Sequence, residues 1–317
     1  MICQGNGPSY GIPSNDPHGT EYIIDDSIDF LRRNKDHNFY INVWLRDVHA
    51  ALNPAEESLA RYKHLMSEGK YVTAMQVYFA AITEMDLQIG RLVDEVDKQG
   101  LGEDTIIIFS NDNGPEDIYV PHAGHHAVGL PGPFRGRKRS LYDGGVRVPL
   151  VLRWKGNTPE NMVDTDTLIS GTDLLPTFAS LCGVQLPQLG EIDGEDMSAA
   201  FLGPSQKRDK DLFWEWRYTG IGQMFNRSPM LAVARDNWKL LFNPDRSRVE
   251  LYDTTVMDDS ELHSCHEKHP ELVNDMMAAA LRWQKELPPA VTDYKAGKDL
   301  YRWPQNLNIT EYEILND

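Results

Sequence analysis

The sequence contains little cysteine and no long apolar run. Its 3 cysteines, at positions 3, 182 and 265, are too few and too scattered for a disulfide framework or a zinc site. No stretch approaches the roughly 18 consecutive apolar residues of a membrane-spanning helix. The first residues, MICQGNGPSYGIPSND, do not have the pattern of a signal peptide. These features argue against a disulfide-rich protein, a cysteine-based zinc protein and a protein with a membrane-spanning helix, but they leave the cellular compartment open.

Basic residues are also scarce. The chain has 31 Lys and Arg against 48 Asp and Glu, a net charge of −17. This balance argues against nucleic acid as a partner, because phosphate binding needs a positive surface. The hydrophobic content of 41% is ordinary for a soluble globular protein, and 317 residues suffice for one large domain or for one domain plus a small one.

Two neighbouring stretches carry the most information about function. The apolar, β-branched run Thr105–Phe109 predicts a buried strand, and Asp112 and Asn113 follow it. Ligands of doubly wound sheets collect beyond the carboxyl ends of such strands, and these two side chains offer hard oxygen ligands. Further along, Arg135-Gly-Arg-Lys-Arg139 places four cations in five positions of an acidic chain. Together they predict an anion site beside a divalent cation.

These stretches, IIIFSNDNGP and GPFRGRKRSLYDGGVRVPLVLRW, resemble the second half of a sulfatase of the alkaline-phosphatase-like superfamily. That family carries S-D-N-G after a strand and then G-K-x-x-x-[YF]-[ED]-G-G-x-R-x-P, which supplies an active-site lysine. Lys138 matches this lysine, whereas Asn111 and Arg137 depart from the usual Ser and Gly. The other matching positions are Tyr142, Asp143, Gly144, Gly145, Arg147 and Pro149.

The resemblance implies a fold and a set of site residues. The fold would be α/β, an alkaline-phosphatase-like mixed sheet between helices with a small C-terminal α+β subdomain. Asp112 and Asn113 would contribute to a Ca²⁺ site, and Lys138 would bind the sulfate and neutralise the leaving oxygen. By itself, Asp112 is more typical of an Asx-turn that closes the strand, and the matching lysine downstream favours the metal site.

Histidines are the remaining candidates. His49 follows the predicted strand Asn38–Leu45 and matches a family histidine that faces the sulfate, although Val48 replaces the usual Pro. Imidazole suits proton transfer near neutral pH, but a surface or capping role is the ordinary alternative. His125 and His126, in PHAGHH, lack metal-ligand spacing, and we expect them to bind substrate or to be solvated. We also expect Arg135 to bind substrate, although a structural role, or one in setting the local electric field, is open for it.

Part of the family's machinery is missing from these 317 residues. Gly11-Ile-Pro-Ser-Asn15 contains the Pro-Ser of the signature C/S-x-P-S-R, but it lacks both the nucleophile and the arginine. The early Asp-Asp pair of the metal site is absent too, so the Ca²⁺ site is half supplied, since Ca²⁺ takes six to eight oxygens. We therefore expect an N-terminally truncated sulfatase that is inactive alone.

The expected substrates are sulfated sugars or aryl sulfates, because the resemblance is to arylsulfatases and N-acetylgalactosamine-6-sulfatase-like enzymes, a family that is usually exported. Two alternatives remain open. The chain could be a phosphoester or phosphonate hydrolase of the same superfamily, or a non-catalytic remnant that serves as an interaction module.

Periodicity predicts how the rest of the chain is organised. Combined with the resemblance, it implies that residues 1–204 form a partial sulfatase catalytic α/β domain, and residues 205–317 a subdomain of antiparallel strands, one helix and a tail. The predicted helices begin near Thr20 and cover Glu56–Met66, Val72–Gln99, Ser170–Val184 and Pro270–Leu287. The predicted strands of the subdomain are Asp211–Tyr218, Pro229–Arg235, Trp238–Asn243 and Arg248–Tyr252.

Overall fold

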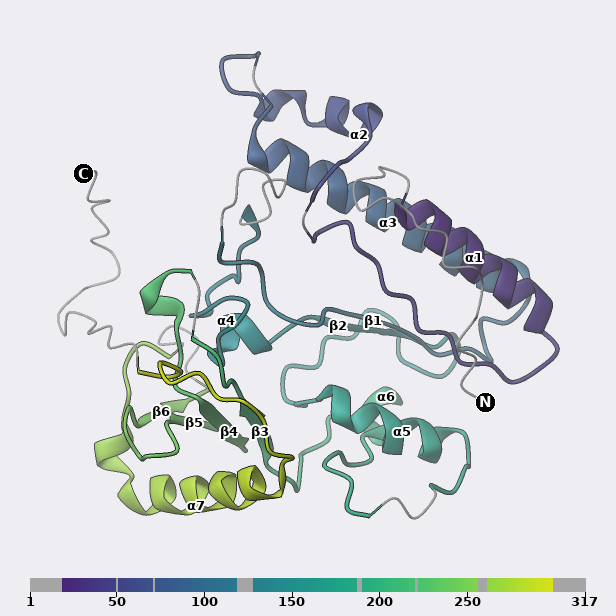
Figure 1. Ribbon diagram of the computed structural model, residues 1–317. Coiled ribbons are helices and arrows are strands. Elements are labelled where there is room, and N and C mark those ends of the chain that lie inside the picture. The colour runs from purple at the N-terminus through teal and green to yellow at the C-terminus, as the bar shows by residue number, and fades with distance from the viewer. Residues whose placement is uncertain are drawn as a thin grey trace.

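The computed structural model describes residues 19–49, 51–70, 72–118, 128–186, 190–219, 222–255 and 261–298. Its first layer is helical: α1 (Gly19–Asn34) packs along α3 (Ala74–Lys98), and α2 (Glu56–Arg61) with the 3-10 turn η1 (Lys63–Leu65) packs on α3 as well (Figure 1). The buried residues Ile24, Ile28 and Leu31 form the inner stripe of α1. The predicted helices of this region are confirmed, although α2 ends earlier than expected.

The ends of α3 follow from local sequence. Thr73 accepts a hydrogen bond from the backbone N–H of Gln76 at 3.2 Å and so caps the first turn. After the last turn, Gly100 adopts a φ of +76°, a left-handed conformation that favours glycine and ends the helix, as the sequence predicted.

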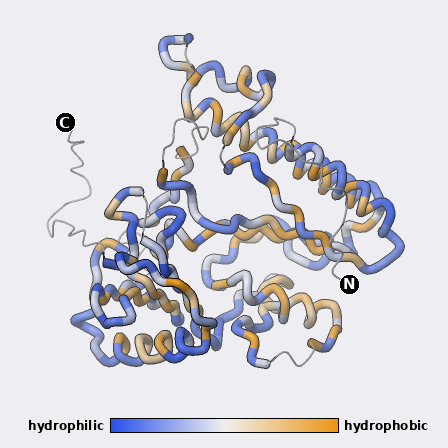
Figure 2. The backbone as a smooth tube through the Cα atoms, in the orientation of Figure 1, coloured by the Kyte–Doolittle hydropathy of each residue, from blue (hydrophilic) through white to orange (hydrophobic). Residues whose placement is uncertain are grey.

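A short ladder lies at the centre of the molecule. β1 (Ile107–Ser110) pairs antiparallel with β2 (Leu150–Arg153), with Ser110 opposite Leu150. The first of these strands was predicted, and Figure 2 shows the largely hydrophobic character of both. This register brings the loop that follows β1 beside the segment that precedes β2. The two stretches singled out in the sequence are therefore adjacent in space.

The segment Asn38–Leu45 differs from expectation. Its residues alternate between exposed and half-buried, and Trp44 is 77% exposed, but within the described residues it joins no strand ladder (Figure 1). The period-2 pattern was therefore correct, but the prediction of a paired strand was wrong for the described part of the chain. Because Asn38–Leu45 is unpaired within the described residues, α3 does not connect two parallel strands of one sheet in that part of the chain. The ring of Tyr40 instead lies 6.3 Å from that of Phe178.

Short helices follow β2. The 3-10 turn η4 (Gly171–Asp173) leads into α5 (Leu174–Leu181), with α6 (Ser198–Phe201) beside it. The side chains of Ser170 and Asp173 form a capping box at this start. The predicted helix over Ser170–Val184 is confirmed, with its first turn in 3-10 geometry.

The C-terminal part is a four-stranded antiparallel meander in the order β3-β4-β5-β6, as the sequence predicted. Its helix α7 covers one face of the sheet (Figure 1). The 3-10 turns η5 (Met224–Asn226) and η7 (His266–Lys268) lie in its connections. The bounds of the main elements are Leu212–Glu215 for β3, Leu231–Arg235 for β4, Trp238–Phe242 for β5, Glu250–Asp253 for β6 and Pro270–Glu286 for α7.

Both faces of this sheet are buried. Side chains alternate along each strand, so Leu240 and Leu251 pack against α7, whereas Leu241 and Tyr252 pack against Leu141 and Tyr142. The segment with the four cations thus covers the second face of the sheet. The division of the chain after residue 204 stays a prediction. Within the described residues no helix is both long and apolar enough to cross a membrane.

Candidate active site

Backbone hydrogen bonds join the loop after β1 to residues 135–147, which we call the basic segment. The N–H of Lys138 donates to the carbonyl oxygen of Pro115 at 2.9 Å, and the N–H of Gly114 donates to that of Gly145 at 2.9 Å. Within the basic segment, the N–H of Gly144 donates to the carbonyl oxygen of Arg135 at 2.6 Å. The two stretches therefore form one unit, which places the backbone of Lys138 next to the Asp112–Pro115 loop.

Glycines make this close packing possible. A Cβ on Gly114 would lie 1.8 Å from the carbonyl oxygen of Gly144, and a Cβ on Gly144 would lie 2.2 Å from that of Gly136. A Cβ on Gly145 would lie 2.2 Å from the carbonyl oxygen of Ser140. These distances explain the paired glycines, since only glycine allows backbones to approach so closely. Two of them, Gly144 and Gly145, belong to the single-turn helix α4 (Asp143–Val146).

The four cations of the basic cluster, Arg135, Arg137, Lys138 and Arg139, have different environments. Arg137 donates to the carbonyl oxygens of Glu116 at 2.9 Å and Gly129 at 2.7 Å. Arg139 forms an ion pair with the Glu116 carboxylate. The ammonium of Lys138 is half-buried and makes no hydrogen bond or ion pair within the part of the chain that the structure describes. Lys138 is thus the cation of the cluster that is available to an added anion.

Glu116 remains charged beside this cluster. Burial alone would raise its pKa, but hydrogen bonds from Arg139 and from the backbone N–H of Ile118 lower the pKa to about 2. The Glu116 carboxylate therefore neutralises Arg139 at ordinary pH.

Asp112 and Asn113 fit part of a metal site. Asp112 is exposed, and the Asn113 side-chain N–H donates to the carbonyl oxygen of Gly114 at 2.8 Å, which leaves the amide oxygen as an acceptor. Two hard oxygens suit Ca²⁺ but do not fill its coordination sphere. Among the described residues, no three acidic, histidine or cysteine side chains cluster to hold a metal. Asp112 and Asn113 could therefore supply only part of the oxygen ligands that a Ca²⁺ ion needs.

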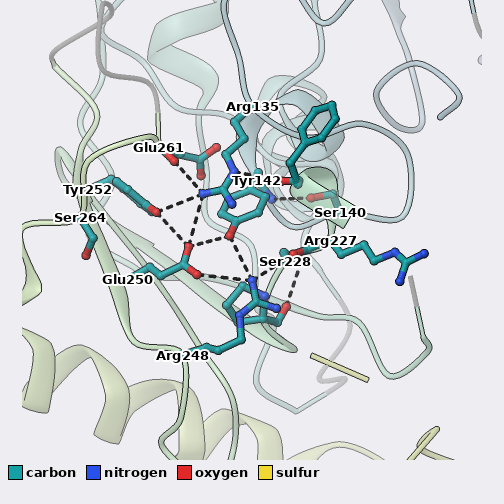
Figure 3. A network of polar contacts seen from close by, with 12 residues as sticks. Arg135, Ser140, Tyr142, Arg227, Ser228, Arg248, Glu250, Tyr252, Glu261 and Ser264 are labelled. Atoms are coloured by element: carbon teal, nitrogen blue, oxygen red, sulfur yellow. Dashed lines mark hydrogen bonds and ion pairs between the residues drawn. The ribbon is translucent and has the colours of Figure 1, made fainter. Parts of the chain in front are cut away.

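The position of Arg135 corrects the prediction that it binds substrate. Its side chain is only 6% exposed, and it donates to the carbonyl oxygens of Phe225 at 3.1 Å and Glu261 at 2.9 Å. Its guanidinium lies 3.8 Å from the ring centroid of Tyr142 (Figure 3). A side chain with these contacts anchors the segment and does not face a substrate, because its donors are directed into the protein.

Of the three histidines predicted at the site, the structure describes His49. His49 is exposed in a turn, and its backbone N–H donates to the carbonyl oxygen of Arg46 at 2.8 Å. The neighbouring Asp47 accepts a hydrogen bond from the hydroxyl of Thr20, which ties this turn to α1. A position for His49 beside the reacting group stays a prediction. His125 and His126 lie outside the described residues.

Sequence reasoning missed the residues that support the basic segment from the C-terminal sheet. Lys239 and Glu250 lie on strands whose other residues are mostly apolar, and both point toward the basic segment. Lys239 is buried between the carboxylates of Asp143 and Glu261, at 2.5 and 2.8 Å. A charge inside an apolar strand pattern was the available signal, since buried charges need partners.

With helices packed beside a central ladder and a small antiparallel subdomain, the fold is that of an alkaline-phosphatase-like α/β protein. The sulfatase family model matches residues 5–184. A second model, N-sulphoglucosamine sulphohydrolase, C-terminal, matches residues 134–286. The chain therefore belongs to the sulfatase family, whose members are generally metal dependent.

Curated relatives support this assignment. The chain is 30% identical over 198 residues to steryl-sulfatase of Rattus norvegicus. The aligned region covers 62% of this chain and 32% of steryl-sulfatase. The chain is 26% identical over 277 residues to N-acetylgalactosamine-6-O-sulfatase of Bacteroides thetaiotaomicron, with coverage of 81% and 49%. The chain thus spans half or less of the length of these relatives.

Solved structures share the fold. One is BT33336S-sulf, a protein from the glycosaminoglycan metabolism of Bacteroides thetaiotaomicron, with a TM-score of 0.68 at 22% identity. The superposition covers 86% of this chain and 55% of BT33336S-sulf. Ps i-CgsB in complex with k-i-k-neocarrahexaose has a TM-score of 0.65 at 22% identity, with coverage of 83% and 54%. At these identities the likeness establishes the fold alone.

Proposed function

We propose that the protein serves the hydrolysis of sulfate monoesters and that Lys138 binds the sulfate group. The observation that carries the proposal is the environment of Lys138. Its three neighbouring arginines are occupied by protein acceptors, whereas its own ammonium has no partner in the described part of the chain. Its backbone is also hydrogen-bonded to the loop that carries the predicted metal ligands.

In this proposal each residue has one task. The ammonium of Lys138 binds the sulfuryl oxygens and neutralises charge on the leaving oxygen, where a fixed cation stabilises the transition state. His49 donates a hydrogen bond or a proton to the same oxygen. Asp112 and Asn113 hold part of a Ca²⁺ site, and Ca²⁺ when bound would polarise the sulfuryl group. The substrates we propose are sulfated sugars or aryl sulfates, as the names of the relatives suggest.

The attacking group is not among these residues, because the signature C/S-x-P-S-R does not occur in the 317 residues. We therefore expect the polypeptide to bind a sulfate ester without turning it over. Phosphonate hydrolysis is the second candidate, since phosphonate monoester hydrolase of Agrobacterium radiobacter shares the fold with a TM-score of 0.51. The sulfatase family assignment favours the first.

The test is a calorimetric titration of the whole chain with 4-nitrophenyl sulfate and, in parallel, with phenylphosphonate. Lys138→Ala should weaken sulfate-ester binding by about 10- to 100-fold, the value of a charge-assisted hydrogen bond. Lys70→Ala, at an exposed lysine in another turn, is the matched control and should bind as the unmodified chain does. Equal affinity of the Lys138→Ala variant would refute the role of Lys138. Tighter binding of the phosphonate would favour the second candidate.

A further inference from the structure

A buried polar network connects the basic segment to strand β6 (Figure 3). At its centre, one carboxylate oxygen of Glu250, Oε2, accepts hydrogen bonds from two phenols. The hydroxyl of Tyr142 donates at 2.6 Å and that of Tyr252 at 2.8 Å. Burial and the negative charge of Glu250 hold the pKa of both tyrosines well above its ordinary value, so both hydroxyls remain donors.

Two arginines complete this Glu250 network. Nη1 of Arg135 lies 3.7 Å from Oε2 of Glu250, and Nη2 of Arg248 lies 3.4 Å from Oε1. The side chains are 6% exposed for Arg135, 9% for Arg248 and 18% for Glu250. Hydrogen bonds in such a low-dielectric environment are strong, and each group is costly to leave unpaired, so the network fixes the geometry of its members.

The network holds the basic segment on both sides of Lys138. Arg135 precedes Lys138 and Tyr142 follows it, and both contact Glu250. Between Lys138 and Tyr142, the N–H of Leu141 donates to the side-chain oxygen of Ser228 at 2.9 Å, a second contact with the C-terminal part. None of the hydrogen bonds and ion pairs of this network involves the Lys138 side chain, so the network can act on it only through the backbone.

We propose that Glu250 is a positioning residue for Lys138. By fixing Arg135 and Tyr142 it holds the intervening turn, so that the N–H of Lys138 meets the carbonyl oxygen of Pro115 and the ammonium is presented beside the Asp112–Pro115 loop. The consequence for sulfate binding rests on the proposed function, but the effect on the Lys138 backbone does not.

Two tyrosines offer a matched test. Tyr142→Phe and Tyr252→Phe each remove one phenol from the same oxygen of Glu250 and keep the aromatic ring. Only Tyr142 belongs to the basic segment, whereas Tyr252 lies on β6 and its hydroxyl meets that segment through a long hydrogen bond, at 3.4 Å, from Nη1 of Arg135. Amide hydrogen exchange of the whole chain, followed by NMR, reports the Lys138–Pro115 bond directly, and the amides of the β4–β5 ladder serve as the reference for overall stability.

Relative to that reference, we expect the Lys138 amide to exchange about tenfold faster in Tyr142→Phe, the effect of one lost hydrogen bond. In Tyr252→Phe we expect a change of about twofold or less. Equal effects of the two substitutions, or an unchanged Lys138 amide in Tyr142→Phe, would overturn the proposal.

A measurement on the unmodified chain covers the case in which Tyr142→Phe does not fold. If the segment is released as a unit, the amides of Lys138 and Leu141 should exchange with the same denaturant dependence. Exchange of Lys138 through a smaller opening, with Leu141 still protected, would contradict the proposal.

Sulfate-ester affinity, measured on the same samples, separates this proposal from the proposed function. Weaker binding in Tyr142→Phe than in Tyr252→Phe would support both. If the unmodified chain binds no sulfate ester, the proposed function fails, and the exchange data still decide the role of Glu250.

Discussion

The backbone N–H of Lys138 donates to the carbonyl oxygen of Pro115 at 2.9 Å, and this bond joins the loop that follows β1 to the segment that precedes β2, at the same end of the central ladder. The oxygens of Asp112 and Asn113 and the ammonium of Lys138 come from these two loops. Because backbone groups make the connection, the arrangement tolerates variation in neighbouring side chains but depends on how closely the two loops can approach.

Replacing Gly114 should therefore disrupt the site. In Gly114→Ala the new Cβ would lie 1.8 Å from the carbonyl oxygen of Gly144, so the loops must separate, and we expect a loss of roughly 1–3 kcal/mol in unfolding free energy. Gly90→Ala is the control, since no atom lies within 4 Å of its Cβ in α3, and should stabilise by about 0.5–1 kcal/mol. Urea denaturation measures both. A neutral Gly114→Ala would show that the loops are not in contact.

Replacing Arg135 should lower the stability of the fold, because its side chain contacts the protein and not a substrate. Arg135→Met would leave Glu250 with one fewer buried partner, and breaking such a pair costs roughly 3–5 kcal/mol. Arg147→Met removes an ion pair with Asp143 from a side chain that is 43% exposed, and should cost under about 1 kcal/mol. Thermal unfolding of both variants would check this difference. A stable Arg135→Met that has lost only sulfate-ester affinity would restore the original prediction of a substrate contact.

Because of Glu261, the free energy of unfolding should fall as the pH rises from 4.5 to about 7. Burial raises its pKa from an ordinary 4.5 to about 7, even though Lys239 lies 2.8 Å away. Between these two values the folded chain holds a proton that the unfolded chain has released, so this contribution is complete below pH 4.5 and lost as the pH passes about 7. The slope reaches at most about −1.4 kcal/mol per pH unit for one proton.

Glu261→Gln should flatten this slope, because its neutral amide does not titrate. Denaturation midpoints across that pH range would measure the change, with Glu267→Gln at an exposed position as the control. Parallel pH profiles for the unmodified chain and Glu261→Gln would mean that Lys239 keeps Glu261 ionised in the fold.

Removing Asp112 should abolish any effect of Ca²⁺ on sulfate-ester binding. In the proposed site, a cation beside Lys138 would add charge near the sulfuryl oxygens, so we expect Ca²⁺ to tighten binding in the unmodified chain but not in Asp112→Ala. Asp104→Ala removes an exposed carboxylate before β1 and should respond as the unmodified chain does. Titrations with and without a chelator would measure this. An equal response to Ca²⁺ in both variants would place the cation elsewhere.

Local patterns in the sequence were sufficient for most of the architecture. Thr73 and Gly100 bound α3 because capping and a positive φ depend on near neighbours. The meander from β3 to β6 was predictable for the same reason, since consecutive strands pair with each other. The resemblance singled out Lys138, and the structure shows that it differs from the adjacent arginines in having no partner in the described part of the chain.

Long-range contacts were not predictable. Whether Arg135 faces a ligand or the protein depends on Glu250, which follows it by more than one hundred residues and has no periodic relation to it. The strand prediction for Asn38–Leu45 had the same weakness, because alternation indicates an extended segment but does not specify its partner. The apolar pattern around Lys239 indicated that this charge is buried, but it did not identify Asp143 and Glu261 as its partners.

The consecutive pairing of β3 to β6 has a consequence for the order of folding. Pairing between neighbours in sequence closes only short loops, so this sheet and α7 can assemble early and at low entropic cost. The contact between Tyr142 and Glu250 spans 108 residues and gains stability only once that sheet exists to receive it. The turn that carries Lys138 should therefore take its final conformation late, on a surface that has already formed, and a destabilised C-terminal sheet would leave this turn without the Glu250 contact that holds it.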